Sequence, residues 1–533
     1  EGIGIEAFGW CDSLESLTVA EGNVKYDSRD NCNAIIDTAR NELVAASNHT
    51  VIPDTVTTIC PQAFSDVTMP ELVIPKNVTN ICAEAFSDSE IENITLMGGM
   101  EELGAYAFYS CDGLKKITIM DGIKTLREGA FSDCPVLTEV ILPGSITSIG
   151  DGVFSDCSSL PSIVLPENLT QIASETFSGC TSLKEITLPE KVTDIESDAF
   201  KDCTALTEIT LPEGTKSIGK GAFSGCTALA DITLSKGVAS IGSNAFSDCT
   251  ALTKVTLPNT LKTIESGAFH GCTGLNSIEI PASVDTINGN PFTGCSKLSN
   301  ITLEAGNACF DSRDNCHAVI ESKTNKLVIG TKDTVIPATV TTIGSGAFDG
   351  CTGLTQITIP DSVTTIGAGA FRNCTGLTQI VIPAGVDWRI SGAGIFSGCT
   401  NLKSLKLAEG NSQYDSRDNC NGVIETATDT LINAYENTVI PSSVKVIGFM
   451  AYTGCDGLTD LTIPEGVTEL RYQAVTNCQA LQSMTIPDSM KTVDAYAVGQ
   501  CNNLREIHWK GNTYSDFSAF IEAFQAANKE DAE

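Results

Sequence analysis

The chain has 533 residues and carries 32 basic against 66 acidic side chains, a net charge of -34. Such an acidic chain repels phosphate backbones and anionic lipid, so nucleic acid and membrane surfaces are poor partners. No run approaches the roughly 18 apolar residues of a membrane-spanning helix. The chain starts without Met and in the middle of a repeat unit, so we expect a mature or trimmed fragment whose export signal or anchor lies outside it.

A cysteine recurs every 23 residues from Cys111 to Cys295. Seven apolar positions keep step with it, as the unit from Cys180 to Phe200 shows, CTSLKEITLPEKVTDIESDAF. A unit of this length cannot bury its own apolar face, so each coil must stack on the next. The period therefore predicts one mainly β solenoid over residues 1–510 with about 18 coils, counted at the position that Phe200 occupies.

Each coil contains two candidate strands. The segment L-x-x-I-x-L-P alternates apolar and polar residues and ends at a Pro, which is typical of a short strand. The following V-x-x-I-G offers a second strand and a turn, and G-A-F-x-x-C returns the chain. Stacking of the coils then predicts parallel sheets.

A stripe of threonines should run along the exposed face of the first strand. Strand propensity alone explains it, but solenoids also bind ligands on such continuous faces, so a binding groove stays open. The candidate binding residues are Thr187, Thr210, Thr233 and Thr256.

Three inserts interrupt the period, at about residues 20–53, 304–337 and 408–441. Each lengthens one 23-residue unit by 33 residues, and the copies align without gaps: YDSRDNCNAII, FDSRDNCHAVI and YDSRDNCNGVI. Each copy has a polar turn, an apolar run, a Thr/Asn/Asp-rich stretch and a second apolar run. This order predicts three β-hairpins that stand out from the solenoid or extend its sheet.

The polar turns of the inserts hold further candidate binding residues. Their oxygens could gather around Ca²⁺, and this alternative stays open. They lack the ligand spacing of a known calcium loop, however, and side-chain to backbone turn bonds, with the neighbouring arginines as ion partners, explain them. We therefore predict no metal and no cofactor. The candidates are Asp27, Arg29, Asp30, Asp311, Arg313, Asp314, Asp415, Arg417 and Asp418.

Of the 22 cysteines, 16 occupy one repeat position, which predicts a column of buried, reduced thiols. Stacked coils place equivalent residues about 4.8 Å apart, slightly wide for a disulfide. Two pairs stay open as disulfides, Cys60 with Cys82 and Cys309 with Cys316.

No motif supports catalysis. The stretch GTKSIGKG, from Gly214 to Gly221, matches a phosphate-binding loop until Gly221, which lacks the magnesium-binding hydroxyl. The four histidines are scattered, without the spacing of metal ligands or of a nucleophile and its base. Trp388 and Arg389 lie where the period stretches to 25, which favours a local bulge over a pocket.

The C-terminal residues 511–533 should cap the solenoid. Phe517, Phe520, Ile521 and Phe524 follow helical spacing behind Ser515, which can cap a helix over 515–527.

With I-G-x-x-A-F-x-x-C-x-x-L-x-x-I-x-L-P-x-x-V in hand, the chain resembles the BspA-like bacterial leucine-rich repeat proteins over residues 1–510. The inserts and the stretch from Trp509 to Tyr514 also look like features of that class. The resemblance implies a leucine-rich repeat solenoid on a bacterial surface, or secreted, whose members are associated with adhesion to host matrix proteins and cells.

Our first hypothesis is therefore a non-catalytic adhesin or interaction protein that binds a host matrix or cell-surface protein or glycan. The repeat fixes an architecture but transfers no binding residue. Two alternatives remain: the targeting module of a larger surface enzyme or sensor, and a structural spacer without a specific ligand.

Overall fold

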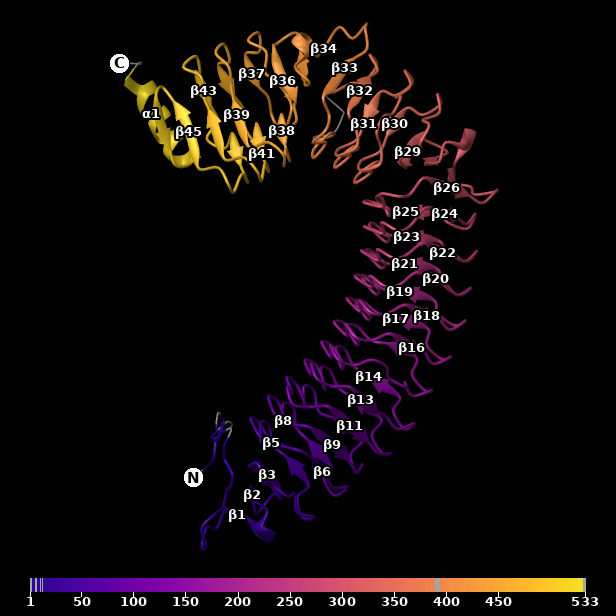
Figure 1. Cartoon of the computed structure of the whole chain (residues 1–533), viewed down its shortest axis with the longest axis vertical. Helices are drawn as coiled ribbons and strands as arrows, with labels where there is room; N and C mark the ends of the chain where they lie inside the picture. The colour runs from indigo at the N-terminus through magenta and orange to yellow at the C-terminus, as the bar shows by residue number, and fades with distance from the viewer. Residues whose placement is uncertain (1, 5–6, 10, 12, 389–393, 531–533) are drawn as a thin grey trace. The chain divides into compact units, whose positions relative to one another are not determined.

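The computed structural model describes the chain except for residues 1, 5–6, 10, 12, 389–393 and 531–533. It contains two compact units, Glu1–Leu275 with Thr286–Pro291 and Asn276–Asp285 with Phe292–Glu533. Both are stacks of short-stranded coils, which confirms the predicted solenoid (Figure 1). Arg389, in the predicted bulge, lies outside the described residues.

In the first unit, each regular coil gives one strand to each of two faces. First strands come from the L-x-x-I-x-L segment: β6 (Leu72–Ile74), β9 (Asn93–Leu96), β11 (Lys116–Ile119), β13 (Glu139–Ile141), β16 (Glu185–Thr187), β18 (Glu208–Thr210), β20 (Asp231–Thr233) and β22 (Lys254–Thr256). Second strands come from V-x-x-I: β4 (Thr58–Ile59), β7 (Asn80–Ile81), β10 (Glu102–Leu103), β12 (Thr125–Leu126), β14 (Ser148–Ile149), β15 (Gln171–Ile172), β17 (Asp194–Ile195), β19 (Ser217–Ile218), β21 (Ser240–Ile241), β23 (Thr263–Ile264) and β25 (Thr286–Ile287). Neighbouring coils pair in parallel and in register, for example Ile195 with Ile218. A further parallel pair lies in the turns, β5 (Thr68–Met69) and β8 (Glu90–Ile91).

The second unit repeats this plan. Its first strands are β24 (Ser277–Ile280), β26 (Asn300–Leu303), β32 (Gln379–Ile382), β33 (Ser404–Leu407), β39 (Asp460–Thr462), β42 (Ser483–Thr485) and β45 (Glu506–Trp509). Its second strands are β30 (Thr342–Ile343), β31 (Thr365–Ile366), β37 (Val446–Ile447), β40 (Glu469–Leu470) and β43 (Thr492–Val493). The turns add β38 (Tyr452–Thr453), β41 (Val475–Thr476) and β44 (Val498–Gly499).

A column of phenylalanine rings fills the core of the first unit. From Phe64 to Phe269 the rings of successive coils stack with centroids 4.5–5.7 Å apart. These side chains are completely buried. The ring contacts therefore join these coils to their neighbours. A single coil could not bury its ring in this way.

The cysteine column runs beside the rings. The Cys203 thiol donates to the carbonyl oxygen of Phe177, one coil back, at 3.1 Å, and this bond recurs from Cys134 to Cys272. Of the 16 cysteines predicted to form the column, all are buried except Cys11, which is exposed, and Cys501, which is half-buried, so the predicted column of packed thiols is confirmed in the other coils. The two pairs left open as disulfides are unbridged.

Each insert is a three-stranded antiparallel meander that joins the second-strand sheet. In the first insert, β1 (Tyr26–Asp27) pairs with β2 (Ile35–Asp37), β2 with β3 (Glu42–Ala45), and β3 runs parallel to β4. The predicted hairpins are therefore correct and extend the sheet, and each gains a short strand that we did not predict. The other copies are β27 (Phe310–Asp311), β28 (Val319–Glu321) and β29 (Lys326–Ile329), then β34 (Tyr414–Asp415), β35 (Val423–Glu425) and β36 (Thr430–Asn433). A 3₁₀ turn follows the first strand of each: η1 (Arg29–Asn31), η2 (Arg313–Asn315) and η3 (Arg417–Asn419).

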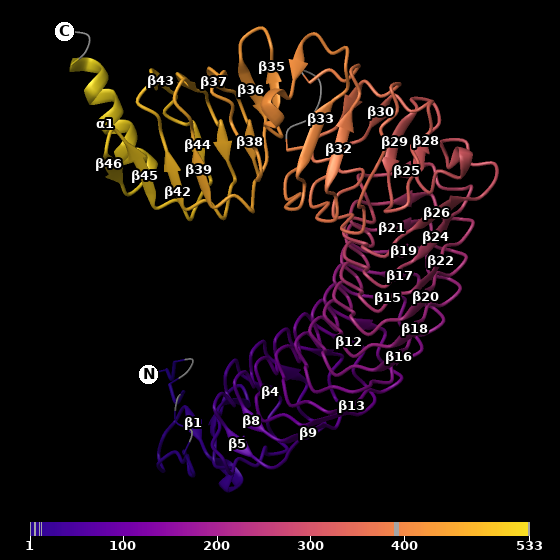
Figure 2. The same ribbon diagram turned by 45° about the horizontal axis from the view of Figure 1, so that its top comes forward.

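A helix closes the C-terminal end (Figure 2). The last first strand, β45, pairs antiparallel with β46 (Asn512–Tyr514), and α1 (Phe517–Glu530) follows. Phe520 and Phe524 pack on Trp509 at ring distances of 5.7 and 5.2 Å. The predicted cap is confirmed, but Ser515 is not the capping residue: the carboxylate of Asp516 accepts from Ala519 N at 2.9 Å. Among the described residues, no helix has the length and apolar character that crossing a membrane needs.

Candidate binding surfaces

The four predicted threonines point to solvent from the first strands of the first unit. Thr187 lies opposite Thr210, and Thr233 lies opposite Thr256. All four are exposed, because the residue before each points into the core. We call this row the threonine column.

Exposed apolar side chains extend the threonine column toward the N-terminus. Val164, 84% exposed, bridges to Thr187, and Ile141, 42% exposed, occupies the same position one coil earlier. We define the apolar patch as five exposed side chains: Val73, Met97, Met120, Ile141 and Val164. Val73, Ile141 and Val164 occupy the Thr position of their coils, with Thr95 and Thr118 between Val73 and Ile141, whereas Met97 and Met120 follow directly after their strands. Our sequence analysis missed the patch, although a Val or Ile where the repeat usually has Thr is a readable signal.

Acidic side chains accompany the threonine column. Glu185 and Glu208 begin neighbouring first strands, are exposed and lie in register. Like charges directly opposite each other repel across a sheet. A partner that brings basic groups to this face would relieve that repulsion.

In the insert turns, the predicted arginines form ion pairs with aspartates of the same insert. Arg313 donates through Nε and Nη2 to the two carboxylate oxygens of Asp311, at 2.7 and 2.6 Å, and through Nη1 to Asn325 Oδ1 at 2.9 Å. The Arg313 guanidinium is the main cause that lowers the pKa of Asp311. Arg29 with Asp27 and Arg417 with Asp415 repeat the pair. These six residues tie the 3₁₀ turn to the hairpin loop.

The remaining insert candidates differ, since Asp30, Asp314 and Asp418 are exposed. Each has a φ of 56–58°, the left-handed conformation that Asp tolerates in tight turns. The structure therefore divides the nine insert candidates into three Arg–Asp ion pairs and three exposed aspartates. Among the described residues, no group of three or more His, Cys, Asp or Glu is arranged to hold a metal ion.

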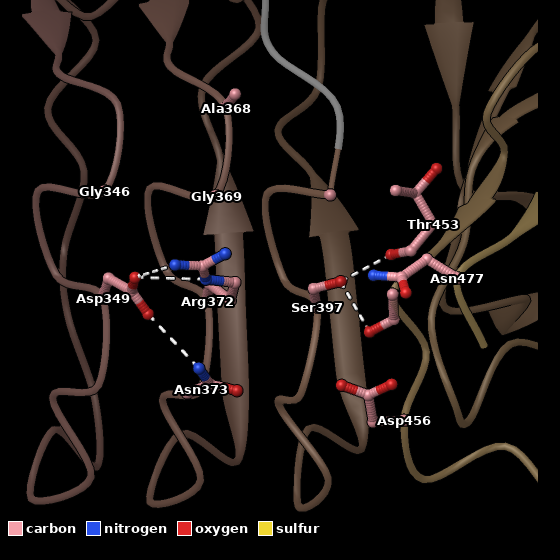
Figure 3. A pocket seen from close by; sticks show the side chains of 12 residues that line it. Gly346, Asp349, Ala368, Gly369, Arg372, Asn373, Ser397, Thr453, Asp456 and Asn477 are labelled. Carbon is pink, nitrogen blue, oxygen red and sulfur yellow. Dashed lines mark hydrogen bonds and ion pairs between the residues drawn. The ribbon is translucent and has the colours of Figure 1, made fainter. Parts of the chain in front are cut away.

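A polar pocket of about 400 Å³ lies beside the third insert, in the second unit (Figure 3). Its side chains come from the turns of neighbouring coils, none of which sequence analysis singled out. They include Asp349, Arg372, Asn373, Ser397, Thr453, Asp456 and Asn477.

The pocket exists because the insert coil lacks the G-A-F-x-x-C turn. In regular coils the turn donates to the next turn, as Asn373 N does to Ser397 O at 2.8 Å. One coil later, Gly398 N instead donates to the Glu436 carboxylate at 3.2 Å. The Ser397 hydroxyl lies 2.7 Å from the carbonyl oxygen of Gly454, across the place of the missing turn.

At the second insert the corresponding gap is closed. Gly294 N reaches Asp349 O directly at 3.3 Å, and a Cβ at Gly350 would meet Gly294 N at 2.6 Å. Lys332 stands there in place of Glu436 and pairs with Asp333. At the third insert, the Glu436 carboxylate therefore accepts the hydrogen bond from Gly398 N. At the second insert, the facing turn accepts the equivalent bond through the carbonyl oxygen of Asp349.

The pocket combines the Arg372–Asp349 ion pair with the carboxylate of Asp456, which accepts from Gln479 N at 3.4 Å. The Asp349 side chain is 5% exposed and accepts from Arg372 Nε at 3.1 Å, and this hydrogen bond raises the pKa of Arg372. Burial raises the pKa of Glu436, and the charge of Asp456 raises it further. Asp456 itself is exposed at the pocket rim.

The sequence matches the family model of the BspA type leucine rich repeat region over residues 44–161, 149–256, 222–327, 319–423 and 432–526. No curated protein matches it. Among solved structures, a leucine-rich repeat protein from Bacteroides ovatus is 26% identical with a TM-score of 0.45, over 65% of this chain and 89% of that chain. A leucine rich cell surface protein from Faecalibacterium prausnitzii is 21% identical with a TM-score of 0.32, over 93% and 95%. One from Eubacterium ventriosum is 21% identical with a TM-score of 0.32, over 75% and 80%.

Proposed function

We propose that this chain, which belongs to the BspA type leucine rich repeat family, is a non-catalytic bacterial protein, displayed on the surface or secreted, that adheres to a protein partner of the host matrix or cell surface. The contact surface is the apolar patch on the first-strand side of the first unit, with the carboxylates of Glu185 and Glu208 at its edge. The apolar patch is the observation that carries this proposal, because exposed apolar side chains gathered on neighbouring coils mark protein contact sites.

The neighbouring charges define the partner's chemistry. Glu185 and Glu208 lie in register beside the threonine column, and the chain has a net charge of -34. A partner with an apolar centre and a basic rim would bury the patch and relieve the repulsion between these carboxylates. Strand pairing fixes the backbone at Val73 and Ile141 in advance, which reduces the ordering that binding requires.

The test compares three variants with the parent chain on a panel of host matrix and cell-surface proteins, by surface plasmon resonance. Ile141→Glu with Val164→Glu disrupts the patch. Thr233→Glu with Thr256→Glu is the matched control on the same face, and Asp30→Asn, Asp314→Asn and Asp418→Asn together test the inserts.

We expect the patch variant to lose at least tenfold in affinity and the other two to stay within twofold. Circular dichroism checks that all three fold. Equal affinity of the patch variant and the parent would refute the contact surface. An absence of saturable binding to any protein of the panel would favour the spacer hypothesis.

A further inference from the structure

Three aromatic rings lie exposed on consecutive coils of the second unit. Phe449, Tyr472 and Tyr496 are 55%, 47% and 71% exposed. The first two rings stack with centroids 6.1 Å apart and planes 8° apart, and Tyr496 meets Tyr472 edge to face at 6.2 Å. Apolar surface left in water contributes nothing to folding, so this aromatic platform points to a ligand.

Backbone hydrogen bonds hold the platform in place. Met450 N donates to Gln473 O at 3.2 Å, and Gln473 N donates to Tyr496 O at 2.9 Å. The three turns are thereby fixed in register, and the rings follow them. The backbone of the platform is therefore arranged before a ligand binds.

The platform and the polar pocket come from the same turns. Phe449 precedes the pocket residue Thr453 by four positions, and Tyr472 precedes the pocket residue Asn477 by five. The coil order therefore places the three exposed rings on the same set of turns as the polar pocket. At about 400 Å³ the hollow lies within the usual range for small-molecule sites, about 300–1,000 Å³.

The pocket offers both donors and acceptors at short range. The Asp456 carboxylate accepts, the Asn477 amide can do both, and Arg372 presents a guanidinium oriented by buried Asp349. Vicinal hydroxyl groups, each a donor and an acceptor, match such a set. The apolar C–H face of a pyranose ring matches an aromatic ring face, which carries partial negative charge.

From this combination we infer that the pocket and the aromatic platform form a binding site for a neutral oligosaccharide, with a sugar unit in the pocket and the following units along the rings. The site is separate from the apolar patch. The exposed Asp456 carboxylate and the net charge of -34 disfavour sialylated or sulfated chains.

The experiment uses the full chain and a panel of neutral oligosaccharides ending in galactose, mannose, fucose or N-acetylglucosamine, with sialylated counterparts as the charge control. Binding is measured by saturation-transfer NMR and isothermal titration calorimetry. Asp456→Ala tests the pocket and Tyr472→Ala tests the platform; both side chains are exposed, so folding should be preserved. Tyr109→Ala is the matched control, an exposed tyrosine of the first unit.

We expect saturable binding of at least one neutral oligosaccharide, at least tenfold weaker in Asp456→Ala and in Tyr472→Ala and within twofold in Tyr109→Ala. The patch variant of the previous section should bind the sugar normally, which separates the two proposals. The inference is overturned if no neutral oligosaccharide binds, if only sialylated chains bind, or if both site variants bind like the parent. Loss of protein binding in Tyr472→Ala without any sugar binding would instead make the platform a protein contact.

Discussion

At the repeat cysteine, a small apolar side chain also supplies a hydrogen-bond donor. The Cys226 thiol is buried and donates to Phe200 O at 3.1 Å. Alanine would fill less volume and leave that carbonyl without its thiol donor. Burial also raises the pKa of Cys226 to about 12, so the thiol stays protonated and unreactive in the folded chain.

This pKa predicts alkaline instability. Above the ordinary thiol pKa of 9.0 the unfolded chain loses a proton that folded Cys226 retains, so the stability from this buried thiol is present below pH 9 and is lost as pH rises toward 12. Cys226→Ala should cost about 1–2 kcal/mol at pH 8. Urea unfolding at pH 8 and pH 10.5 should show a smaller deficit at the higher pH, and a constant deficit would contradict the linkage.

A second prediction at this scale concerns Arg313. Its guanidinium joins the strand β27 to the hairpin loop through Asp311 and Asn325, with bonds of 2.6–2.9 Å. Arg313→Ala should lower the free energy of unfolding by about 1–3 kcal/mol, since charge-assisted hydrogen bonds are lost. Arg313→Lys should recover only part, because an ammonium cannot form the fork. Full recovery in chemical denaturation would mean that charge alone matters.

The strand ladders and the phenylalanine column both hold neighbouring coils together. Second strands form an unbroken six-stranded ladder from β15 to β25, whereas the first strands of the same coils pair only two by two. The exposed first-strand face thus depends on the core beneath it. The phenylalanine column supplies that core in every coil from Phe64 to Phe269.

Removing one ring should therefore be costly. Phe223 stacks at 5.3 Å on both Phe200 and Phe246. Phe223→Ala should destabilise the first unit by about 3–5 kcal/mol, from lost burial and a cavity. Phe223→Leu retains most of the volume and should cost less than half as much. The check is urea unfolding followed by circular dichroism, and equal costs would show that stacking geometry matters more than volume.

Sequence periodicity predicted these elements because each coil repeats the same contacts. At the inserts, the sequence period no longer predicts all of the structure. Tyr26 and Asp27 form an additional strand because β2 offers them a free edge, which no local pattern reveals. Likewise, Lys332 and Glu436 occupy equivalent positions of two aligned inserts, yet only the second accepts the hydrogen bond of the preceding turn. The aromatic platform was readable in part, since Phe449 and Tyr472 lie one 23-residue period apart.

At the scale of the whole molecule, packing contacts join only neighbouring coils, whereas the repulsion between negative charges acts over longer distances. Each compact unit is a linear array in which coils contact their neighbours, so stability is a sum of adjacent interfaces. The net charge of -34 acts on the entire array. In-register carboxylates such as Glu185 and Glu208 add repulsion at coil spacing.

Salt should therefore stabilise the chain. Screening weakens repulsion between exposed charges once the Debye length falls to about 8–10 Å. Raising NaCl from low to physiological concentration should increase the unfolding midpoint, with a few tenths of a kcal/mol from each like-charged pair. Glu185→Gln with Glu208→Gln should respond less to salt than the parent in the same melting experiment. An unchanged or inverted salt response of the parent would contradict this.

The terminal cap also limits growth. A stack of equivalent parallel coils ends in a surface that fits the start of another stack, which is the geometry of an open, fibre-forming assembly. Here β46 runs antiparallel to β45, and α1 covers Trp509 with Phe520 and Phe524. A second molecule would meet a reversed strand and a helix instead of a coil. The same few residues that finish the fold thus keep this end of the array from seeding a polymer.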